Sequence, residues 1–454
     1  MLKQHFPVTC HTDHVGPAST FVCIHGMKKD GTEFIPLALS KGATKIVVER
    51  SAHIPEQMHE RIRQHGATIE FVDDARAALA QLSAQAAGFP AKQLRIIGIT
   101  GTKGKTTVSF ILRHILAKLG KRVAMLSTVH NAILDTIYPA ELTTAQPDYL
   151  HQFLKTCVEQ NVEWVVLEIA AQAFSLNRVD TIELDAAIYT NVSPEHGEFY
   201  PTFIAYTEAK SRIFNHLKTE TAPIILNADD PIVKAQGWTC NRNLCHPIFL
   251  YQDRMQRHAY PETLLGDYNA HNAYMALNCL EALGLGYEKD LAKLLDDFPP
   301  VPGRLEKYVL KNGARAYIDY AHNHSSTKAV LSALREHTTD LIVVIGCSGD
   351  RDKTKRPHMG AEAALWGNTV YVTSDNPRSE DPDAIIRDVV AGIPQTTTAH
   401  VIVDADRGKA IRAACAQAKP ESIIAILGKG PDEYTIIKGV KYPFIEKNIL
   451  TEFQ

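Results

Sequence analysis

A glycine-rich run, GITGTKGKTT at residues 98–107, contains residue types that can bind a nucleoside triphosphate. An apolar stretch at residues 94–97 precedes it and an amphipathic segment at residues 107–119 follows it, which predicts a loop between a strand and a helix. Backbone N–H groups around Gly101 and Gly104 can surround phosphate oxygens, and the positive end of the helix adds to their attraction. The sequence therefore predicts a nucleotide-triphosphate site.

Two polar side chains of this run have roles in such a site. Lys105 can reach the terminal phosphate oxygens, and the hydroxyl group of Thr106 can bind Mg²⁺. The run departs from the strict G-x-x-x-x-G-K-T pattern, because Ile99 stands at the first glycine position and Gly101 takes over its part. A glycine turn without a ligand is the alternative interpretation, and the Lys-Thr pair in its expected place argues against it.

A charged residue also follows a second expected strand. Glu168 closes the apolar run of residues 164–167, where it could supply another contact to Mg²⁺ beside the nucleotide. An exposed carboxylate at a strand end is the simpler alternative, because loops at the carboxyl ends of strands are functional only as a statistical trend.

Strand-like runs alternate with helical stretches along the chain, which predicts an α/β fold. The length of 454 residues suggests roughly three domains, since single cores seldom exceed about 250 residues. The first is a small α/β domain at residues 1–90, with strands at 21–24, 45–48 and 69–72. An alanine-rich stretch at residues 75–91, with Gly88 and Pro90, marks its end.

The two remaining domains are separated by a proline-rich segment at residues 299–303. The central domain, at residues 91–300, is expected to be a P-loop ATPase domain with a mostly parallel sheet, and its strands are predicted at 94–97, 122–127, 164–169, 186–190 and 223–227. The C-terminal domain, at residues 301–454, is expected to be Rossmann-like, with strands at 316–320, 341–345, 370–373, 401–403 and 423–427.

Composition restricts the partners of the chain. The formal charge of −3, from 48 basic and 51 acidic residues, gives no general attraction for a polyanion and argues against a nucleic-acid partner. No apolar run approaches the about 20 residues of a membrane span, and the first residues lack the apolar core of a signal peptide. We therefore expect a cytoplasmic protein without a membrane partner.

The eight cysteines lack the C-x-x-C spacing of zinc sites and redox dithiols, so we expect reduced and mostly buried thiols. Cys240, Cys245 and His246 form the one local cluster, for which metal binding is the alternative to an ordinary loop.

Many short motifs, in a fixed order, resemble those of the Mur ligases, and most closely the MurE type that adds the third amino acid of the peptidoglycan stem. The resemblance spans nearly the whole chain. Besides the glycine-rich loop it is carried by LTT at 142–144, LEI at 167–169, TNVSPEH at 190–196, EAK at 208–210, GDYNAHN at 266–272, PGRLE at 302–306, DYAH at 319–322, GCSGDRD at 346–352, SDNPRSEDP at 374–382 and GKG at 428–430.

The resemblance implies an ATP-dependent ligase of peptidoglycan synthesis. Such enzymes transfer the γ-phosphate of ATP to a peptide carboxylate, and the amine of an incoming amino acid then attacks the acyl phosphate. Thr106 and Glu168 would hold one Mg²⁺, while His196 and a carbamylated Lys210 would hold a second. An unmodified Lys210 would repel Mg²⁺, so the alternative is a solvated helix lysine in an ordinary ion pair. Lys105, Glu168, His196 and Lys210 are the expected catalytic residues.

The same resemblance implies which residues contact ATP. Asn269 and Asn272 would lie near the adenine, Arg304 would reach the phosphates from the domain hinge, and Asp319 and His322 would close the site from the third domain. The whole set is Gly101, Thr102, Lys103, Gly104, Lys105, Thr106, Thr107, Asn269, Asn272, Arg304, Asp319 and His322, with Asn323 beside them and Asp404 and Arg407 as weaker matches. Closure would protect the acyl phosphate from water.

The loop at residues 375–378 resembles the version found in enzymes that add meso-diaminopimelate. Arg378, with Arg356 as a second guanidinium, could hold the distal carboxylate of this amino acid, which lysine lacks. The whole expected amino-acid site comprises Arg356, Asp375, Asn376, Pro377, Arg378, Gly428 and Asp432. Asp432 stands where the family has glutamate, so the side chain expected to bind the distal amine is one methylene shorter.

The expected acceptor is a UDP-muramoyl dipeptide, or a related carboxylate, bound by Thr12, Thr143, Thr144 and Arg178. Here the chain departs from the family pattern. The family motif Asp-Ser-Arg is replaced by His11-Thr12-Asp13, so its arginine is absent. The family motif Ser-Ser-His is replaced by AAQ at residues 170–172, and a family glutamine is replaced by Leu176.

Several functions remain open at this stage. The first is the addition of meso-diaminopimelate to UDP-N-acetylmuramoyl-L-alanyl-D-glutamate. The others are a Mur-type ligase that uses a different carboxylate acceptor or adds lysine or another amino acid, a catalytically silent nucleotide-binding partner, and a folylpolyglutamate-type ligase. The sequence does not indicate the oligomeric state.

Overall fold

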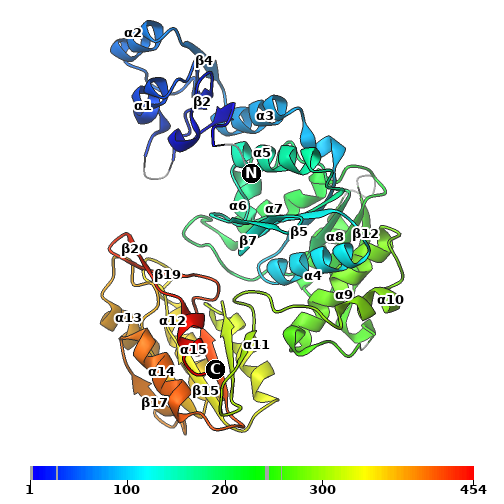
Figure 1. Cartoon of the computed structure of the whole chain (residues 1–454), viewed down its shortest axis with the longest axis vertical. Helices are drawn as coiled ribbons and strands as arrows, with labels where there is room; N and C mark the ends of the chain where they lie inside the picture. Colours follow the sequence, from blue (N-terminus) through cyan, green and yellow to red (C-terminus); the bar gives the residue numbers. More distant parts are fainter. Residues whose placement is uncertain (1–3, 27–28, 241–244, 257) are drawn as a thin grey trace. The chain divides into compact units, whose positions relative to one another are not determined.

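The computed structural model describes residues 4–26, 29–240, 245–256 and 258–454. The chain forms two compact units. Unit 1 comprises Met1–Glu195, Thr202–Met255 and Met275–Leu291, and unit 2 comprises His196–Pro201, Gln256–Tyr274 and Ala292–Gln454. Across the described residues, every helix is too short or too polar to cross a membrane. The predicted α/β class is confirmed, since three separate sheets consist largely of parallel strands flanked by helices (Figure 1).

The first sheet of unit 1 has four parallel strands, β1 (Val8–Thr9), β2 (Thr20–Val22), β3 (Lys45–Glu49) and β4 (Thr68–Val72). Successive residues of β3 point to opposite faces, so Ile46 packs with α1 (Ile35–Ser40) and Val47 with α3 (Ala75–Ala87). The alanine-rich stretch is therefore largely the helix α3, which Asp74 caps at its start and Gly88 ends in a left-handed conformation.

The second sheet of unit 1 has the strand order β12-β11-β10-β5-β9-β6-β7-β8. Its first six strands are parallel: β12 (His246–Leu250), β11 (Pro223–Asn227), β10 (Ala186–Tyr189), β5 (Arg95–Thr100), β9 (Trp164–Glu168) and β6 (Val123–Leu126). The neighbours β10 and β9 flank β5, so the carboxyl ends of these three strands meet at one edge.

Helices cover both faces of this sheet, which explains why its central strands are apolar throughout. The helices of this sheet within unit 1 are α4 (Lys105–Lys118), α5 (Pro147–Glu159), α6 (Ala171–Ser175), α7 (Phe203–Ser211) and α8 (Pro231–Thr239). Helix α2 (Glu56–Gln64) belongs to the first sheet. Helices α9 (Asp267–Ala282) and α10 (Glu288–Ala292) each have residues in both units. Helix α3 packs against α5 (Figure 1).

Unit 2 contains a six-stranded sheet in the order β13-β14-β18-β15-β16-β17. Only β13 (Glu306–Val309) is antiparallel to its neighbour; the others are β14 (Arg315–Asp319), β18 (Ile423–Leu427), β15 (Leu341–Ile345), β16 (Thr369–Val372) and β17 (His400–Val403). Its helices are α11 (His324–Arg335), α12 (Lys355–Trp366), α13 (Pro382–Val390), α14 (Arg407–Gln417) and α15 (Glu446–Thr451).

Two short hairpins were missed by the sequence patterns. They are β7–β8 (His130–Ile133 and Thr136–Pro139) and β19–β20 (Tyr434–Ile437 and Val440–Pro443). The turn of the second is Lys438-Gly439, with φ of 49° and 82°, which suits a type I′ turn. Its first position is lysine instead of the usual asparagine or aspartate, so the turn signal was weak. Strands β1, β12 and β13 were also not predicted.

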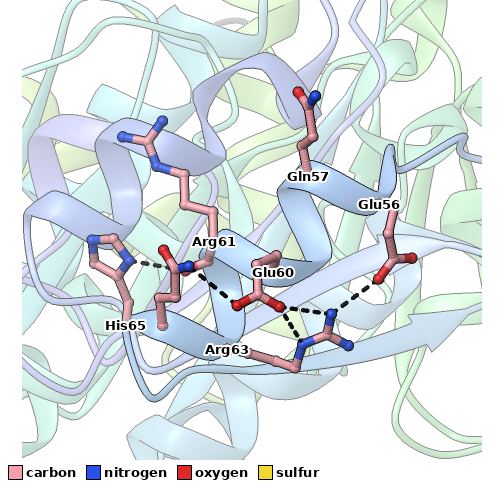
Figure 2. A pocket seen from close by; sticks show the side chains of 7 residues that line it. Glu56, Gln57, Glu60, Arg61, Arg63 and His65 are labelled. Carbon is pink, nitrogen blue, oxygen red and sulfur yellow. Dashed lines mark hydrogen bonds and ion pairs between the residues drawn. The ribbon is translucent and has the colours of Figure 1, made fainter.

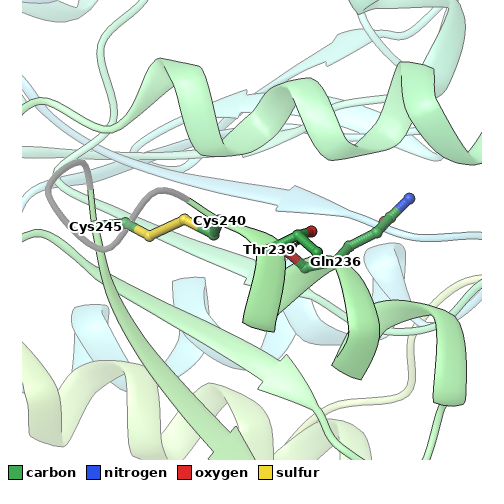
Figure 3. The surroundings of a disulfide bond; sticks show 4 residues. All are labelled: Gln236, Thr239, Cys240 and Cys245. Carbon is green, nitrogen blue, oxygen red and sulfur yellow. Dashed lines mark hydrogen bonds between the residues drawn. A yellow bond between two sulfur atoms is a disulfide. The ribbon is translucent and has the colours of Figure 1, made fainter.

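Cys240 and Cys245 form a disulfide at the end of α8, next to Thr239 and Gln236 (Figure 3). The prediction of reduced thiols is therefore wrong for this pair, and bonded sulfurs are not thiolate ligands for a metal. The remaining cysteines are free, and all of them are buried except the half-buried Cys10.

An open depression lies along α2 and is lined by Glu56, Gln57, Glu60, Arg61, Arg63, Gln64 and His65 (Figure 2). Arg63 pairs with Glu56 and Glu60, each at 3.0 Å, on the exposed face of this helix. These charges neutralise one another, and the depression is not part of the predicted site.

Candidate active site

The loop between β5 and α4 has the backbone shape of a phosphate-binding loop. Gly101 and Gly104 have φ values of 142° and 85°, which favour glycine. Gly104 immediately precedes α4, so the N–H groups of the first helical turn border the loop. A Cβ atom on Gly101 would lie 1.9 Å from Thr190 Oγ1. Both predicted glycines are thus required by the geometry of the loop.

We expect Gly101→Ala to weaken ATP binding by at least about 100-fold, because the clash with Thr190 and the unfavourable φ both deform the loop. Calorimetric titration with ATP measures this effect. Gly120→Ala is the matched control, since Gly120 also has a positive φ of 73° but nothing within 4 Å of its Cβ position. An unchanged ATP affinity of the Gly101 variant would contradict the assignment of the loop.

The segment that follows β10 braces this loop. The N–H of Thr102 donates to the carbonyl of Asn191 at 2.8 Å, and the N–H of Lys103 donates to Asn191 Oδ1 at 2.9 Å. The hydroxyl of Thr190 donates to the carbonyl of Lys103 at 2.5 Å. Thr190 and Asn191 were known from sequence only as part of the TNVSPEH motif, and their contacts assign them a positioning role.

Two lysine ammonium groups meet at one backbone carbonyl. Lys105 Nζ and Lys210 Nζ both donate to the carbonyl of Gly101, at 2.8 and 2.7 Å. Lys105 also donates to the carbonyl of Thr102 at 3.1 Å, and Lys210 lies 4.7 Å from the ring centre of Tyr206. The two amines therefore lie where the loop would receive phosphate oxygens.

Burial acts strongly on these amines. It lowers the pKa of Lys210 well below its usual value, the Lys105 ammonium lowers it further, and Glu195 acts in the opposite direction. Burial also lowers the pKa of Lys103 to about 8, against a raising effect of Glu195. Lys210 is therefore a helix lysine that is fully enclosed, and the alternative of a solvated surface lysine is wrong.

Glu168 is fully buried at the end of β9, so the alternative of an exposed strand-end carboxylate is wrong. Thr106 Oγ1 donates to Glu168 Oε2 at 3.2 Å, and Ser109 Oγ donates to Oε1 at 3.1 Å. Thr128 donates to the same carboxylate through its hydroxyl at 2.9 Å and its N–H at 3.2 Å. Within the described residues, these neutral groups are the hydrogen-bond partners of the carboxylate.

This arrangement fits Mg²⁺. A buried carboxylate whose charge meets only neutral donors gains free energy from a hard cation with oxygen ligands, and Thr106 adds a hydroxyl beside it. In the described part of the chain, no three His, Cys, Asp or Glu side chains gather as a metal site. The protein thus offers only part of a coordination shell, as is usual for Mg²⁺, which keeps water and phosphate ligands.

Several predicted residues belong to unit 2 and are described within it. His196 has a φ of 60° and its Nδ1 lies 3.3 Å from Glu198 Oε1. Asn269 and Asn272 are buried on the first turns of α9, where Asn272 Nδ2 donates to Asn269 Oδ1 at 3.3 Å. The shared face of the two asparagines agrees with a joint role.

Asp319, Arg304 and His322 are gathered at the end of β14. Asp319 accepts from the N–H groups of Leu305 and Ala321, each at 2.8 Å, and burial raises the pKa of its carboxyl group against the opposing charge of Arg304. Arg304 lies over the ring of Tyr320, at 4.8 Å from its centre, and His322 Nδ1 contacts the carbonyl of Tyr320 at 2.7 Å. Asp319 thus fixes the backbone that carries Arg304.

The loop after β16 meets the glycine turn after β18. Asp375 and Asn376 are buried, and Gly428, with a φ of 119°, brings the backbone close to Asp375. Lys429, which sequence reasoning did not select, is fully buried, and its Nζ donates to Asn376 Oδ1 at 3.1 Å and lies 3.5 Å from Asp375 Oδ1. A lysine between two glycines in the GKG motif was the available signal. Pro377 is also buried in this loop.

Arg378 is held by its backbone to the β19–β20 hairpin. Its N–H donates to the carbonyl of Ile436 at 2.9 Å, and its carbonyl accepts from the N–H of Lys438 at 2.6 Å. The buried Nε atom of Arg378 has no hydrogen-bond partner among the described residues. Burial raises the pKa of Asp432, against opposing effects that include the charges of Lys429 and Arg378. The charge of Arg378 therefore acts on the carboxyl group of Asp432, as expected for two side chains of one binding site.

Arg356 is placed differently from the sequence expectation of a guanidinium that a ligand can reach. Its side chain is fully buried, with Nη1 2.9 Å from Asp388 Oδ2 and Nη2 2.9 Å from Glu380 Oε1. Two carboxylates thus occupy both amino groups: Asp388 lies on α13, which packs against α12, and Glu380 lies in the loop before α13. Arg407 is likewise enclosed, paired with Glu446 at 2.6 Å.

The predicted acceptor residues Thr143, Thr144 and Arg178 lie beside Glu168. Thr143 Oγ1 lies 3.1 Å from the hydroxyl of Thr128, which contacts Glu168, and Thr144 Oγ1 donates to the Glu168 carbonyl at 2.9 Å. Arg178 Nη1 donates to the carbonyl of Thr144 at 2.9 Å. Thr12 lies in a 3₁₀ turn of the N-terminal sheet, and Lys41 Nζ donates to its carbonyl at 2.9 Å.

Comparison with known proteins matches the chain to three domain families: the Mur ligase family catalytic domain at residues 7–87, the Mur ligase middle domain at 99–246 and the Mur ligase glutamate ligase domain at 303–430. A relative from Clostridium botulinum, named UDP-N-acetylmuramoyl-L-alanyl-D-glutamate–2,6-diaminopimelate ligase, is 34% identical over 95% of this chain and 91% of its own. The chain belongs to the Mur ligase family.

Two further proteins of the same name resemble this Mur ligase along its length. One, from Aquifex aeolicus, is 32% identical and covers 100% of this chain and 94% of its own. The other is a solved structure with a TM-score of 0.65 and 27% identity, covering 99% of this chain and 94% of its own. The resemblance predicted from the motifs is confirmed.

Proposed function

We propose that this Mur ligase uses ATP to join meso-diaminopimelate to UDP-N-acetylmuramoyl-L-alanyl-D-glutamate in peptidoglycan synthesis. The observation that carries the reaction type is the pair of lysine side chains, Lys105 and Lys210, whose Nζ atoms meet at the carbonyl of Gly101 beside the buried Glu168. The names of the full-length relatives support the choice of substrates.

The proposed reaction has two bond-forming steps. A carboxylate oxygen of the acceptor attacks the γ-phosphorus of ATP, and the bond to the bridging oxygen breaks with its electrons on ADP. The amine of the amino acid then attacks the acyl carbon, phosphate leaves with the electron pair of the C–O bond, and the nitrogen loses a proton. Lys105 and the N–H groups at the start of α4 neutralise the phosphate oxygens as the carboxylate approaches.

Thr106 and Glu168 would hold one Mg²⁺, and His196 with a carbamylated Lys210 would hold a second. When bound, Mg²⁺ would stabilise negative charge on the transferred phosphoryl group. The chain's own part is to enclose Glu168 among Thr106, Ser109 and Thr128, which fixes the carboxylate in one orientation.

The enclosure of Lys210 supports its carbamylation. Burial lowers the pKa of this amine, so a larger share of it is neutral near neutral pH than for a surface lysine. The neutral nitrogen forms a bond to the carbon of CO₂, one C=O electron pair moves to oxygen, and the nitrogen loses a proton, so that the neutral amine becomes a negative carbamate. Raising the pH favours this change, because it increases the neutral fraction.

Arg378 is the proposed contact to the distal carboxylate of the amino acid, and its unpartnered Nε supports this role. We expect Arg378→Lys to raise the KM for meso-diaminopimelate by about 10- to 100-fold, because lysine cannot bind a carboxylate in a bidentate way. The KM for ATP should stay unchanged. Steady-state kinetics measures both constants.

Arg387→Lys is the control for this variant, since Arg387 is an exposed arginine on α13 whose contact is an ion pair with Asp381 at 3.5 Å. Equal effects of the two substitutions, or a wild-type preference for lysine over meso-diaminopimelate, would contradict the proposed amino-acid specificity.

A ligase of the same type with another carboxylate acceptor is the second candidate. It is favoured by the 3₁₀ turn at residues 12–14, where Asp13 pairs with Lys41 at 3.6 Å in place of the arginine of the family motif.

Phosphate release from ATP, measured with a panel of acceptors and amino acids, tests both candidates. The proposal expects release only when UDP-muramoyl dipeptide and meso-diaminopimelate are both present. Release with a different acceptor would favour the second candidate, and no release with any pair would contradict both.

A further inference from the structure

A buried arginine next to the acceptor threonines has an incomplete set of partners. Arg178 is 8% exposed, and its Nη1 donates to the carbonyl of Thr144 at 2.9 Å. Its Nε is buried and has no hydrogen-bond partner among the described residues. In the part of the chain that the structure describes, no carboxylate forms an ion pair with this guanidinium. A buried positive charge of this kind is costly unless an anion accompanies it.

A second arginine, Arg76, lies in the first turn of α3 close to Arg178. Asp74, which caps α3, accepts from Nδ2 of Asn177 at 3.0 Å, so the residue before Arg178 is bonded to the start of this helix. Arg76 Nη2 donates to the carbonyl of His25 at 2.9 Å, and among the described residues no carboxylate forms an ion pair with Arg76. Burial lowers the pKa of Arg178, and the charge of Arg76 lowers it further.

An acidic side chain on α5, the helix that packs against α3, is engaged by neutral groups. Asp148, at the start of α5, accepts from Thr9 Oγ1 at 2.7 Å, from the N–H of Cys10 at 3.2 Å and from the N–H of Tyr149 at 2.8 Å. These bonds fasten β1 to α5 near the turn that carries Thr12 and Asp13. The Asp148 carboxylate therefore links the two sheets of unit 1 by hydrogen bonds to neutral groups.

We propose that Arg76 and Arg178 together bind an anionic group of the acceptor, either a phosphate or a carboxylate. Arg76 thereby supplies the guanidinium that the family motif places at the position of Asp13 in this chain. Two like charges, neither of them in an ion pair with a carboxylate among the described residues, repel each other in the free protein, and an anion between them relieves this repulsion with charge-assisted hydrogen bonds. This assignment rests on the proposed function for the identity of the acceptor.

The test is the affinity of the full-length protein for UDP-N-acetylmuramoyl-L-alanyl-D-glutamate, measured by calorimetry and as KM. Arg76→Gln should weaken binding and raise KM about 10-fold or more, as expected for the loss of a hydrogen bond between charged groups. The kcat and the KM values for ATP and the amino acid should change by less than about 2-fold, and Arg76→Lys should recover part of the affinity. A purely structural role of Arg76 would instead alter all constants and the melting temperature.

Arg50→Gln is the matched control, because Arg50 is an exposed arginine just after β3 that pairs with Asp73 at 2.9 Å. Free UDP separates the two sources of the anion. If Arg76→Gln also weakens the binding of UDP, the two arginines bind the diphosphate. If Arg76→Gln weakens only the binding of the UDP-muramoyl dipeptide, the two arginines bind its carboxylate.

Normal acceptor affinity in Arg76→Gln overturns this assignment and leaves the proposed function intact. If the wild-type protein binds another carboxylate acceptor instead, and Arg76→Gln weakens that binding, the proposed acceptor is wrong and the arginine assignment stands. Failure of the wild-type protein to bind any acceptor of the panel contradicts both.

Discussion

Lys210→Met is expected to lower kcat by about 1,000-fold, which corresponds to the loss of one strong electrostatic contribution to the transition state. Methionine fills a similar volume, so the packing near Tyr206 is retained, but the side chain can neither carry a carbamate nor bond the carbonyl of Gly101. Initial rates of phosphate release measure the effect. ATP affinity should fall much less, because the loop is braced independently by Asn191.

The modification itself gives this prediction a second measurement. Wild-type protein that has been depleted of CO₂ should lose activity and regain it with bicarbonate, whereas Lys210→Met should not respond. Lys218→Met is the control, since Lys218 is a more exposed lysine that lies 3.4 Å from Asp185. A Lys210→Met enzyme that keeps most of its activity would contradict the catalytic assignment, and a wild-type enzyme indifferent to CO₂ would contradict carbamylation.

Glu168→Gln is expected to lower kcat by about 100- to 1,000-fold at fixed Mg²⁺ and to raise the Mg²⁺ concentration required for half activity. The amide removes the negative charge while keeping the shape of the side chain. It also places an NH₂ group against some of the donors that now meet the carboxylate, namely Thr106, Ser109 and Thr128. Activity measured across a Mg²⁺ titration distinguishes the loss of metal affinity from the loss of catalysis.

A melting curve of Glu168→Gln controls for damage to the fold. Glu163→Gln is the matched substitution, because Glu163 lies just before the same strand and is exposed beside Lys121 at 3.9 Å. If Glu168→Gln keeps the wild-type dependence on Mg²⁺, Glu168 is not a metal ligand.

The glycine-rich loop could be predicted because its function depends on residues adjacent in the chain. The order of strand, glycines and helix is encoded locally, and Gly101 and Gly104 have the backbone conformations that the sequence implied. The central strands of the parallel sheets, such as β5, β9 and β15, were also predictable, since burial on both faces makes them almost continuously apolar.

Side-chain partners from distant segments could not be predicted in the same way. Arg356 reads as an available guanidinium, yet Glu380 and Asp388 reach it from an adjoining loop and helix. The brace formed by Asn191 and the enclosure of Glu168 by Thr128 depend on the order of strands in the sheet. Such pairings follow from topology, which local patterns do not encode.

The hairpin β19–β20 contacts the loop at residues 375–378 mainly through main-chain groups: Ile436 bonds the loop through its N–H and its carbonyl, and Lys438 through its N–H. Main-chain bonds do not depend on side-chain identity, so this ribbon can change its sequence without losing its attachment. Natural selection can thereby vary the side chains beside Arg378 one at a time. Substitutions in the hairpin could thus change which amino acid a relative accepts, while its catalytic residues stay the same.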